Sequence, residues 1–214
     1  MIRVRVAPFC LIATVFGGAS AEVPQSSSPT VIVRLYNLAE VPAGEIARST
    51  SRASKIYERI GVRLVWLDCS VPAKNARCDS SSPIVLNLRL MPSRMQPPEG
   101  LPKGIFGFAL MSTDGGFATT ANVYFERVSE IADGRRLRRA VLLGAMMAHE
   151  LGHLLLGIDS HSRVGLMTLP WGPKTLLDAD RDLLGFSKGE ADCVQQAVQT
   201  RASAIQRHAA TRSN

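Results

Sequence analysis

Long hydrophobic runs are missing from this 214-residue sequence. The apolar stretch at residues 6–18 is shorter than the ~20 residues that a membrane-spanning helix needs. No later segment of the sequence is long and apolar enough either, so we expect no stable membrane insertion. At 46% hydrophobic residues the chain can still build a core, and its length fits one domain.

Aromatic residues are also scarce, at 6% of the chain. The net charge is +7, but the basic residues are scattered except for the run at residues 135–139. No aromatic residue lies within that run, and no known nucleic-acid-binding motif surrounds it. We therefore interpret the run as a solvated surface beside the start of a helix, and nucleic acid is not an expected partner.

The start of the chain has the three parts of a secretory signal peptide. Arg3 and Arg5 form a basic region, and residues 6–18 form a short apolar region. Ala-Ser-Ala at residues 19–21 matches the small-residue pattern of a cleavage site. We expect the mature chain to begin at Glu22 and to be secreted or periplasmic.

Cysteine is limited to four residues, one of which, Cys10, lies in the expected leader. Cys69 and Cys78 are nine residues apart and bracket a polar loop. In an exported protein this arrangement predicts a disulfide, with two free thiols as the alternative. Cys193 is then left over, either as a buried thiol or as a residue that pairs with another chain.

Hydrophobic patterns predict alternating strands and helices from residue 30 onward. Strands are expected at residues 30–35, 62–67, 84–90, 105–111 and 117–125. The third strand is expected to be central because it is apolar almost throughout, and Asp114-Gly115-Gly116 predicts a hairpin turn between the last two. Helices are expected at residues 43–60, 137–156, 176–184 and 190–208, with a connection at 126–134.

Histidine is scarce too, with four residues in the chain, yet three of them fall within thirteen positions. His149 and His153 enclose Glu150 in the pattern H-E-x-x-H, within an otherwise apolar helix. Residues four apart lie about 40° apart around a helix, so both imidazoles face one space and can bind zinc. Glu150 projects to the side, where it can take a proton from a metal-bound water. The alternative is a core helix with incidental histidines.

A third metal ligand is expected shortly after this helix. Gly157 is suited to end the helix in a left-handed conformation and to reverse the chain, which brings His161 back to the metal. Asp159 is an alternative third ligand, and Glu190 on a later helix is another. A closed structural zinc site with four ligands would need Cys193 or Asp159 as the fourth.

Around these residues the chain resembles the zincin metallopeptidases, and among them the metzincins. The metzincin pattern is H-E-x-x-H-x-x-G-x-x-H followed by a methionine-containing Met-turn, and the first two histidines and the glutamate match it directly. Gly157 comes one residue later than the family glycine. Asp159 occupies the place of the third ligand, and His161 comes two residues later. Met167 resembles the Met-turn methionine.

The resemblance also extends to secreted bacterial proteins with an H-E-L-G-H-L-L-L-G…H-S…G-L-M run. It implies an α+β fold of the metzincin kind: a mixed, mostly five-stranded sheet, a long active-site helix, a Met-turn and a C-terminal helix. It further implies a Zn²⁺-dependent metallopeptidase that acts on peptide or protein substrates with Glu150 as general base. A non-catalytic zinc-binding or interaction module on a degenerate scaffold is the alternative.

With this resemblance the chain divides into four segments. They are a signal peptide at residues 1–21, a disordered lead-in at 22–29, a metallopeptidase-like domain at 30–200 and a polar tail at 201–214. The strand at residues 106–111 is a candidate for the sheet edge that an extended substrate joins, with an ordinary sheet strand as the alternative.

Overall fold

The structure of the chain is a computed structural model that describes residues 28–70, 78, 84–101, 105–110, 117–157 and 160–212. These residues form one five-stranded sheet and five helices, so the expected α+β class is confirmed. The segments predicted as signal peptide and lead-in lie almost entirely outside the described residues. None of the described helices is long and apolar enough to cross a membrane.

The sheet combines four parallel strands with one antiparallel edge strand. The strands are β1 (Thr30–Asn37), β2 (Arg63–Asp68), β3 (Val85–Met91), β4 (Gly107–Leu110) and β5 (Thr120–Tyr124). Their order is β2-β1-β3-β5-β4, and β4 pairs antiparallel with β5. The central place of β3 and the pairing of β4 with β5 confirm two predictions. The turn predicted at residues 114–116 lies outside the described residues.

The five helices agree with the predicted ones except at their ends and in one connection. They are α1 (Ala43–Glu58), α2 (Phe125–Arg135), α3 (Arg139–Leu156), α4 (Pro173–Asp180) and α5 (Lys188–Arg212). The predicted connection at residues 126–134 is the helix α2, whose buried side is small: Val128 and Ala132, four residues apart. The helix predicted at 176–184 begins earlier, because Pro173 is well suited to the first turn.

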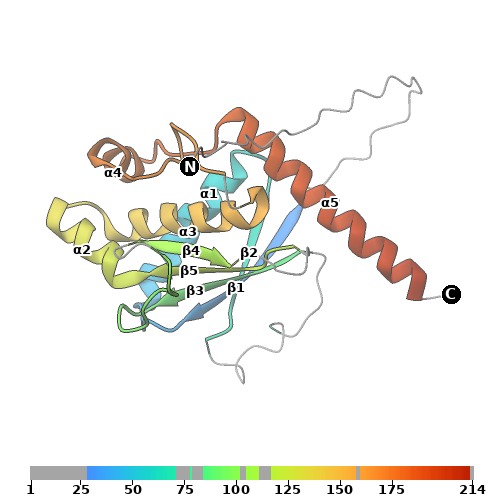
Figure 1. Ribbon diagram of the computed structural model, residues 1–214, viewed down its shortest axis with the longest axis horizontal. Coiled ribbons are helices and arrows are strands. Elements are labelled where there is room, and N and C mark those ends of the chain that lie inside the picture. Colours follow the sequence, from blue (N-terminus) through green and yellow to red (C-terminus); the bar gives the residue numbers. More distant parts are fainter. Residues whose placement is uncertain are drawn as a thin grey trace.

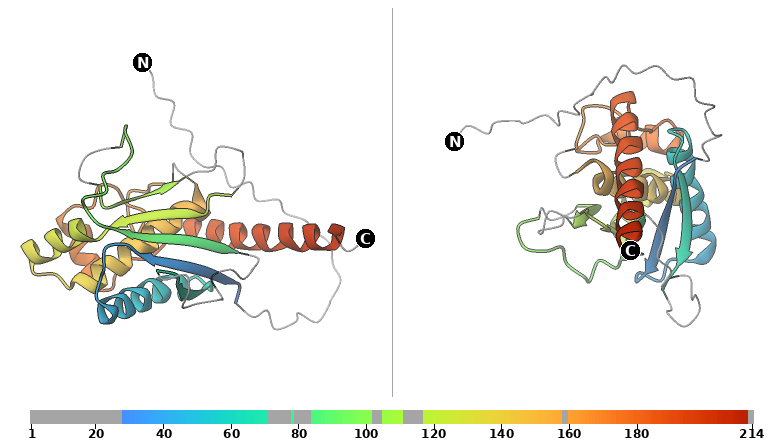
Figure 2. Two further views of the ribbon diagram at one scale, coloured as in Figure 1. Left: turned by 90° about the horizontal axis from the view of Figure 1, so that it is seen from below. Right: turned by 90° about the vertical axis from the view of Figure 1, so that its right-hand side faces the viewer.

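Helix α5 continues into the segment predicted as a polar tail, as far as Arg212. It passes the C-terminal end of α3 and then extends beyond the sheet (Figures 1 and 2). Arg201, within the predicted tail, is buried and bonded to the body of the molecule. The first part of that segment therefore belongs to the folded structure.

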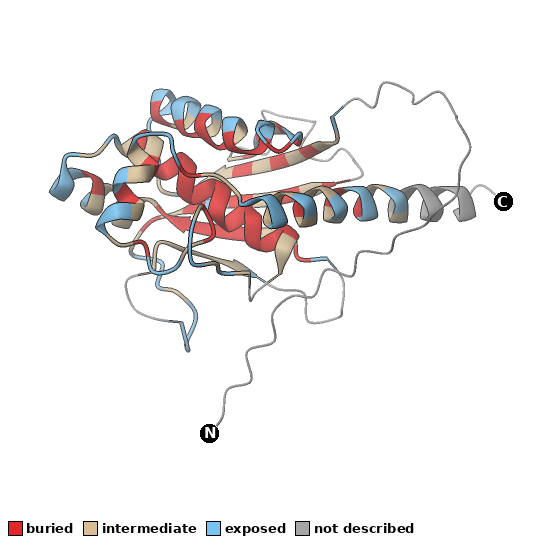
Figure 3. Cartoon of the chain, turned by 90° about the horizontal axis from the view of Figure 1, so that it is seen from above, coloured by how far each residue is buried: buried red, intermediate tan, exposed pale blue. Residues whose placement is uncertain are grey.

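Helices α1 and α3 pack on each other and cover one face of the sheet, as the view onto the helices in Figure 3 shows. Alternate strand residues point into this interface, with Val31 and Val33 on β1 and Leu86 and Leu88 on β3 fully buried. Gly144 allows the two helices to approach closely. A Cβ atom at Gly144 would lie 2.4 Å from the backbone oxygen of a residue on α1.

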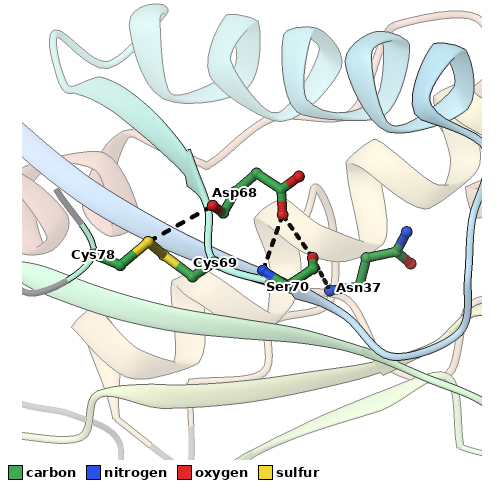
Figure 4. Close-up of a disulfide and its surroundings, with 5 residues drawn as sticks. All are labelled: Asn37, Asp68, Cys69, Ser70 and Cys78. Carbon is green, nitrogen blue, oxygen red and sulfur yellow. Dashed lines mark hydrogen bonds between the residues drawn. A yellow bond between two sulfur atoms is a disulfide. The ribbon is translucent and has the colours of Figure 1, made fainter. Parts of the chain in front are cut away.

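The predicted disulfide between Cys69 and Cys78 is present, directly after β2 (Figure 4). Hydrogen bonds fix the adjoining chain: Ser70 donates its hydroxyl to Asp68 at 2.6 Å, and the backbone N–H of Asn37 donates to Ser70 Oγ at 2.9 Å. Cys193 lies on α5, half-buried and outside this disulfide.

Candidate metal centre

The H-E-x-x-H residues lie in the C-terminal half of α3, a helix that is buried along nearly its whole length. Their side chains are nearly inaccessible: His149 is 3% exposed, Glu150 4% and His153 7%. Ionisable groups at such depth cost free energy unless they have partners or a function. The three residues therefore need an explanation beyond packing.

Gly157 ends α3 and redirects the chain, as predicted, but in a different conformation. Its φ is 98° and its ψ is 173°: φ is positive, as expected, but ψ is far from the left-handed helical value. This region is open to glycine and almost closed to other residues. The Gly157 N–H still donates to the last turn, at His153 O, over 2.9 Å.

The chain after Gly157 brings His161 beside the two helix histidines. The ring centroids of His161 and His153 are 4.6 Å apart, and those of His161 and His149 are 5.7 Å apart. One nitrogen from each of the three residues lies within 4.8 Å of the others, an arrangement that could hold a metal ion. Within the described part of the chain, the cluster includes neither Glu190 nor Cys193.

Hydrogen bonds orient both buried imidazoles. His149 Nδ1 lies 2.8 Å from the carbonyl oxygen of Leu166, which can only accept, so the ring proton is on Nδ1. Ser160 donates its hydroxyl to Gly157 O at 2.6 Å and therefore accepts from His153 Nδ1, 2.9 Å away. Such contacts at the second ring nitrogen are typical of metal-binding histidines.

These tautomers leave two Nε2 lone pairs facing each other. The Nε2 atoms of His149 and His153 are 3.1 Å apart. No proton lies between them in these tautomers, so the two lone pairs repel each other, and a cation bound to both nitrogens would remove that repulsion. Zinc–nitrogen bonds of 2.0–2.1 Å in a tetrahedron imply a nitrogen–nitrogen separation of about 3.3 Å. The His149–His153 spacing is close to that value, and a ring nitrogen of His161 lies within 4.8 Å of both.

Burial also sets the protonation of the site. Desolvation is the main reason that the pKa of His149 falls to about 3 and that of His153 to about 4, so both are neutral at pH 7. Neutral imidazole is the form that binds metal. Desolvation raises the pKa of Glu150 to about 8 when no cation is nearby.

The carboxyl group of Glu150 lies against the edge strand β4. A Cβ atom built at Gly107 would be 2.7 Å from Glu150 Oε1, so only a glycine leaves room for the carboxyl group there. The glutamate predicted as the base is therefore in contact with the strand that was a candidate for the substrate edge. The contact between Gly107 and Glu150 was not predicted from the sequence.

Met167 packs against α3 at Gly152, which lies between the two histidines in the sequence. It is fully buried, and a Cβ at Gly152 would lie 2.8 Å from its sulfur atom. The Trp171 ring meets His149 edge to face, with centroids 5.8 Å apart. Gly152 and Trp171 were not predicted as site residues from the sequence. The glycine inside H-E-L-G-H was the available signal for a close contact on that side of α3.

The alternative ligands have other positions. Glu190 accepts from the backbone N–H of Ser187 at 2.7 Å and in turn donates its own backbone N–H to Ser187 Oγ at 3.4 Å. This reciprocal pair is a capping box at the start of α5. Asp159 lies outside the described residues.

No protein-family model and no curated protein sequence matches the chain. Among solved structures, the chain is similar to the crystal structure of archaemetzincin from Methanopyrus kandleri, with 18% sequence identity and a TM-score of 0.47. The match covers 83% of this chain and 99% of that chain. Similarity at this level assigns neither a family nor an activity.

Proposed function

We propose that the chain is a zinc-dependent metallopeptidase that hydrolyses peptide bonds. The observation that supports this most is the pairing of a three-histidine cluster with a buried glutamate that does not join the cluster. A site that served structure alone would not need Glu150. The three histidines would hold zinc, which supplies a Lewis acid and lowers the pKa of water to about 7.

Glu150 would act as the general base. As a carboxylate it would accept a proton from the attacking water and return it to the leaving amine. A cation at the three histidines favours the ionised carboxylate, which opposes the effect of burial on its pKa. Met167, against Gly152, would support the histidine pair from below in the manner of a Met-turn.

Strand β4 would position the substrate. It is the last strand of the sheet order, so one side of its backbone has no strand partner within the described sheet. An extended peptide can pair with such an edge through backbone hydrogen bonds. Contact between Gly107 and Glu150 would then bring the peptide backbone close to the base.

The test is cleavage of a peptide library by zinc-loaded protein, read by mass spectrometry. We expect cleavage by the wild type, and a kcat/KM lower by about 10²–10⁴ for Glu150→Gln with zinc content unchanged. Stoichiometric zinc without cleavage of any peptide would favour a non-catalytic zinc-binding module. Such a module would bind zinc equally well with and without the glutamate.

We also propose that the protein is exported and that cleavage after Ala21 removes the leader. The basic, apolar and small-residue regions of the leader support this, and the Cys69–Cys78 disulfide fits an oxidising compartment. Intact-mass measurement of exported protein should give a chain that starts at Glu22. A chain that retains residues 1–21 would contradict the proposal.

A further inference from the structure

A cavity of about 270 Å³, largely open to solvent, lies at the C-terminal end of α3. Its walls come from three segments: Leu155 and Leu156 on α3, Phe117 before β5, and the α5 residues Cys193 and Ala197. The described residues of its lining include no charged side chain. Phe117 is half exposed, so an apolar surface leads into it from solvent.

Helix geometry places this cavity beside the metal centre. Leu156 follows His149 by seven residues, which returns it to nearly the same side of α3, one turn beyond His153. In Figure 1 this is the end of α3 that α5 crosses. Leu155, the other α3 residue of the lining, points about 100° away from Leu156, so the cavity begins at the edge of the histidine side of α3 and continues toward α5.

Strand β4 also leads from the metal centre toward the cavity. It begins at Gly107, against Glu150, and ends at Leu110, opposite Thr120 at the start of β5. Phe117 comes three residues before Thr120. The edge strand thus leads from the base to the wall of the cavity that Phe117 forms.

Arg201 fixes the three walls to one another. Its guanidinium donates to the carbonyl oxygen of Ala118 at 3.1 Å and to that of Leu154, and it lies 4.7 Å from the Phe117 ring centroid. Carbonyl groups in the last turn of a helix lack helical partners and favour a cation. A buried arginine is accommodated there, behind the Phe117 ring, and it holds the three walls together before any ligand arrives.

We propose, on the basis of the proposed peptidase function, that this cavity binds an apolar substrate side chain on the N-terminal side of the cleaved bond. A peptide antiparallel to β4 runs from Leu110 toward Gly107, so its N-terminal part lies at the cavity. Leu156 is ~7.5 Å along the helix from the midpoint of the two histidines, at 1.5 Å per residue. An extended peptide covers this distance in two to three residues.

The lining and size of the cavity define its occupant. The described lining residues, uncharged and largely apolar, disfavour a carboxylate or an ammonium group, which would lose hydration without gaining a partner among them. The volume lies below the ~300–1,000 Å³ of sites that take a drug-sized ligand. One leucine, methionine or phenylalanine side chain, two or three residues before the cleaved bond, is the expected occupant.

Cleavage specificity gives the first test. Peptides randomised at those two positions should be cleaved about tenfold or more faster with leucine or phenylalanine than with aspartate or glycine. Ala197→Trp, which fills the cavity, should abolish the preference while peptides with glycine there are still cleaved. Gln199→Trp, at an exposed position on the same helix, is the matched control and should keep the preference.

Alkylation of Cys193 gives a second test that needs neither turnover nor a variant. Peptide mapping of zinc-loaded wild type should show Cys193 protected by acetyl-Phe-Phe-Gly-hydroxamate, whose hydroxamate binds the metal. Acetyl-Asp-Asp-Gly-hydroxamate should leave it reactive. Protection without cleavage of any peptide would overturn the peptidase and retain the cavity. Cleavage without either the preference or protection would overturn the cavity and retain the peptidase, and the absence of cleavage and protection would overturn both.

Discussion

Gly107 on the edge strand β4 and Glu150 on the helix α3 are in direct contact. A Cβ atom at Gly107 would lie 2.7 Å from Glu150 Oε1 and 2.5 Å from the backbone oxygen of Asn122. The glycine is therefore required by two neighbours, one the proposed base and the other the adjoining strand. This contact couples the position of the sheet edge to the position of the carboxyl group.

Gly107→Ala should thus impair catalysis while leaving the metal ligands intact. The methyl group has no space, so β4 or the Glu150 side chain must move, at a cost of about 1–3 kcal/mol in the free energy of unfolding. We expect kcat/KM to fall by tenfold or more with zinc content unchanged. Gly134→Ala is the control, because nothing lies within 4 Å of a Cβ there and alanine favours a helix. Equal activity of both variants would contradict the role of Gly107.

His161→Ala should lose zinc. The structure brings His161 to the two helix histidines, and two imidazoles alone rarely retain zinc against competing chelators. Metal analysis after dialysis against a weak chelator would measure this. Asp159→Ala should retain zinc under the same conditions. If Asp159→Ala loses the metal and His161→Ala keeps it, aspartate is the third ligand.

Ser160→Ala should weaken zinc binding without removing a ligand. The Ser160 hydroxyl accepts from His153 Nδ1, and loss of such an orienting contact typically lowers metal affinity 10–100-fold. Ser162→Ala is a matched control, because the Ser162 hydroxyl donates to Val164 O and is exposed. Competition with a fluorescent zinc chelator would give both affinities. Equal affinities would show that Ser160 does not orient the histidine.

The sequence predicted the features that depend on local pattern. Runs of β-branched residues predicted the strands, and H-E-x-x-H predicted two of the three clustered histidines, whose spacing depends only on the helix. The Cys69–Cys78 disulfide followed from loop spacing and the expected compartment. The helix α2 was missed because its buried side consists of little more than Val128 and Ala132.

Contacts between distant segments could not be predicted in this way. Gly107 and Glu150 are 43 positions apart, and no sequence pattern around either residue indicates that they are in contact. Arg201 was predicted to lie in the polar tail. Its burial could not be predicted, because it depends on carbonyl groups that other elements supply. The role of Glu190 could have been predicted, because Ser187 and Glu190 are three residues apart and form a recognisable capping-box pattern in the sequence.

Stability of the metal-free protein should depend on pH through two opposing groups. His149 and His153 have folded pKa values of about 3 and 4, below their usual 6.5, so their contribution to stability is complete above about 6.5 and is lost as the pH falls to about 3. Glu150 has a folded pKa of about 8 against 4.5, so its contribution is complete below 4.5 and is lost as the pH rises to about 8.

Glu150→Gln separates the two effects, because it removes the glutamate titration and leaves the histidines. In chelator-treated protein we expect the variant to become more stable than wild type as the pH rises from 5 to 8, by at least ~1 kcal/mol at pH 8. Urea unfolding at several pH values would measure this difference. Zinc should reduce it, since a nearby cation favours the carboxylate. A difference that stays constant from pH 5 to 8 would mean that the folded protein ionises Glu150 without a metal.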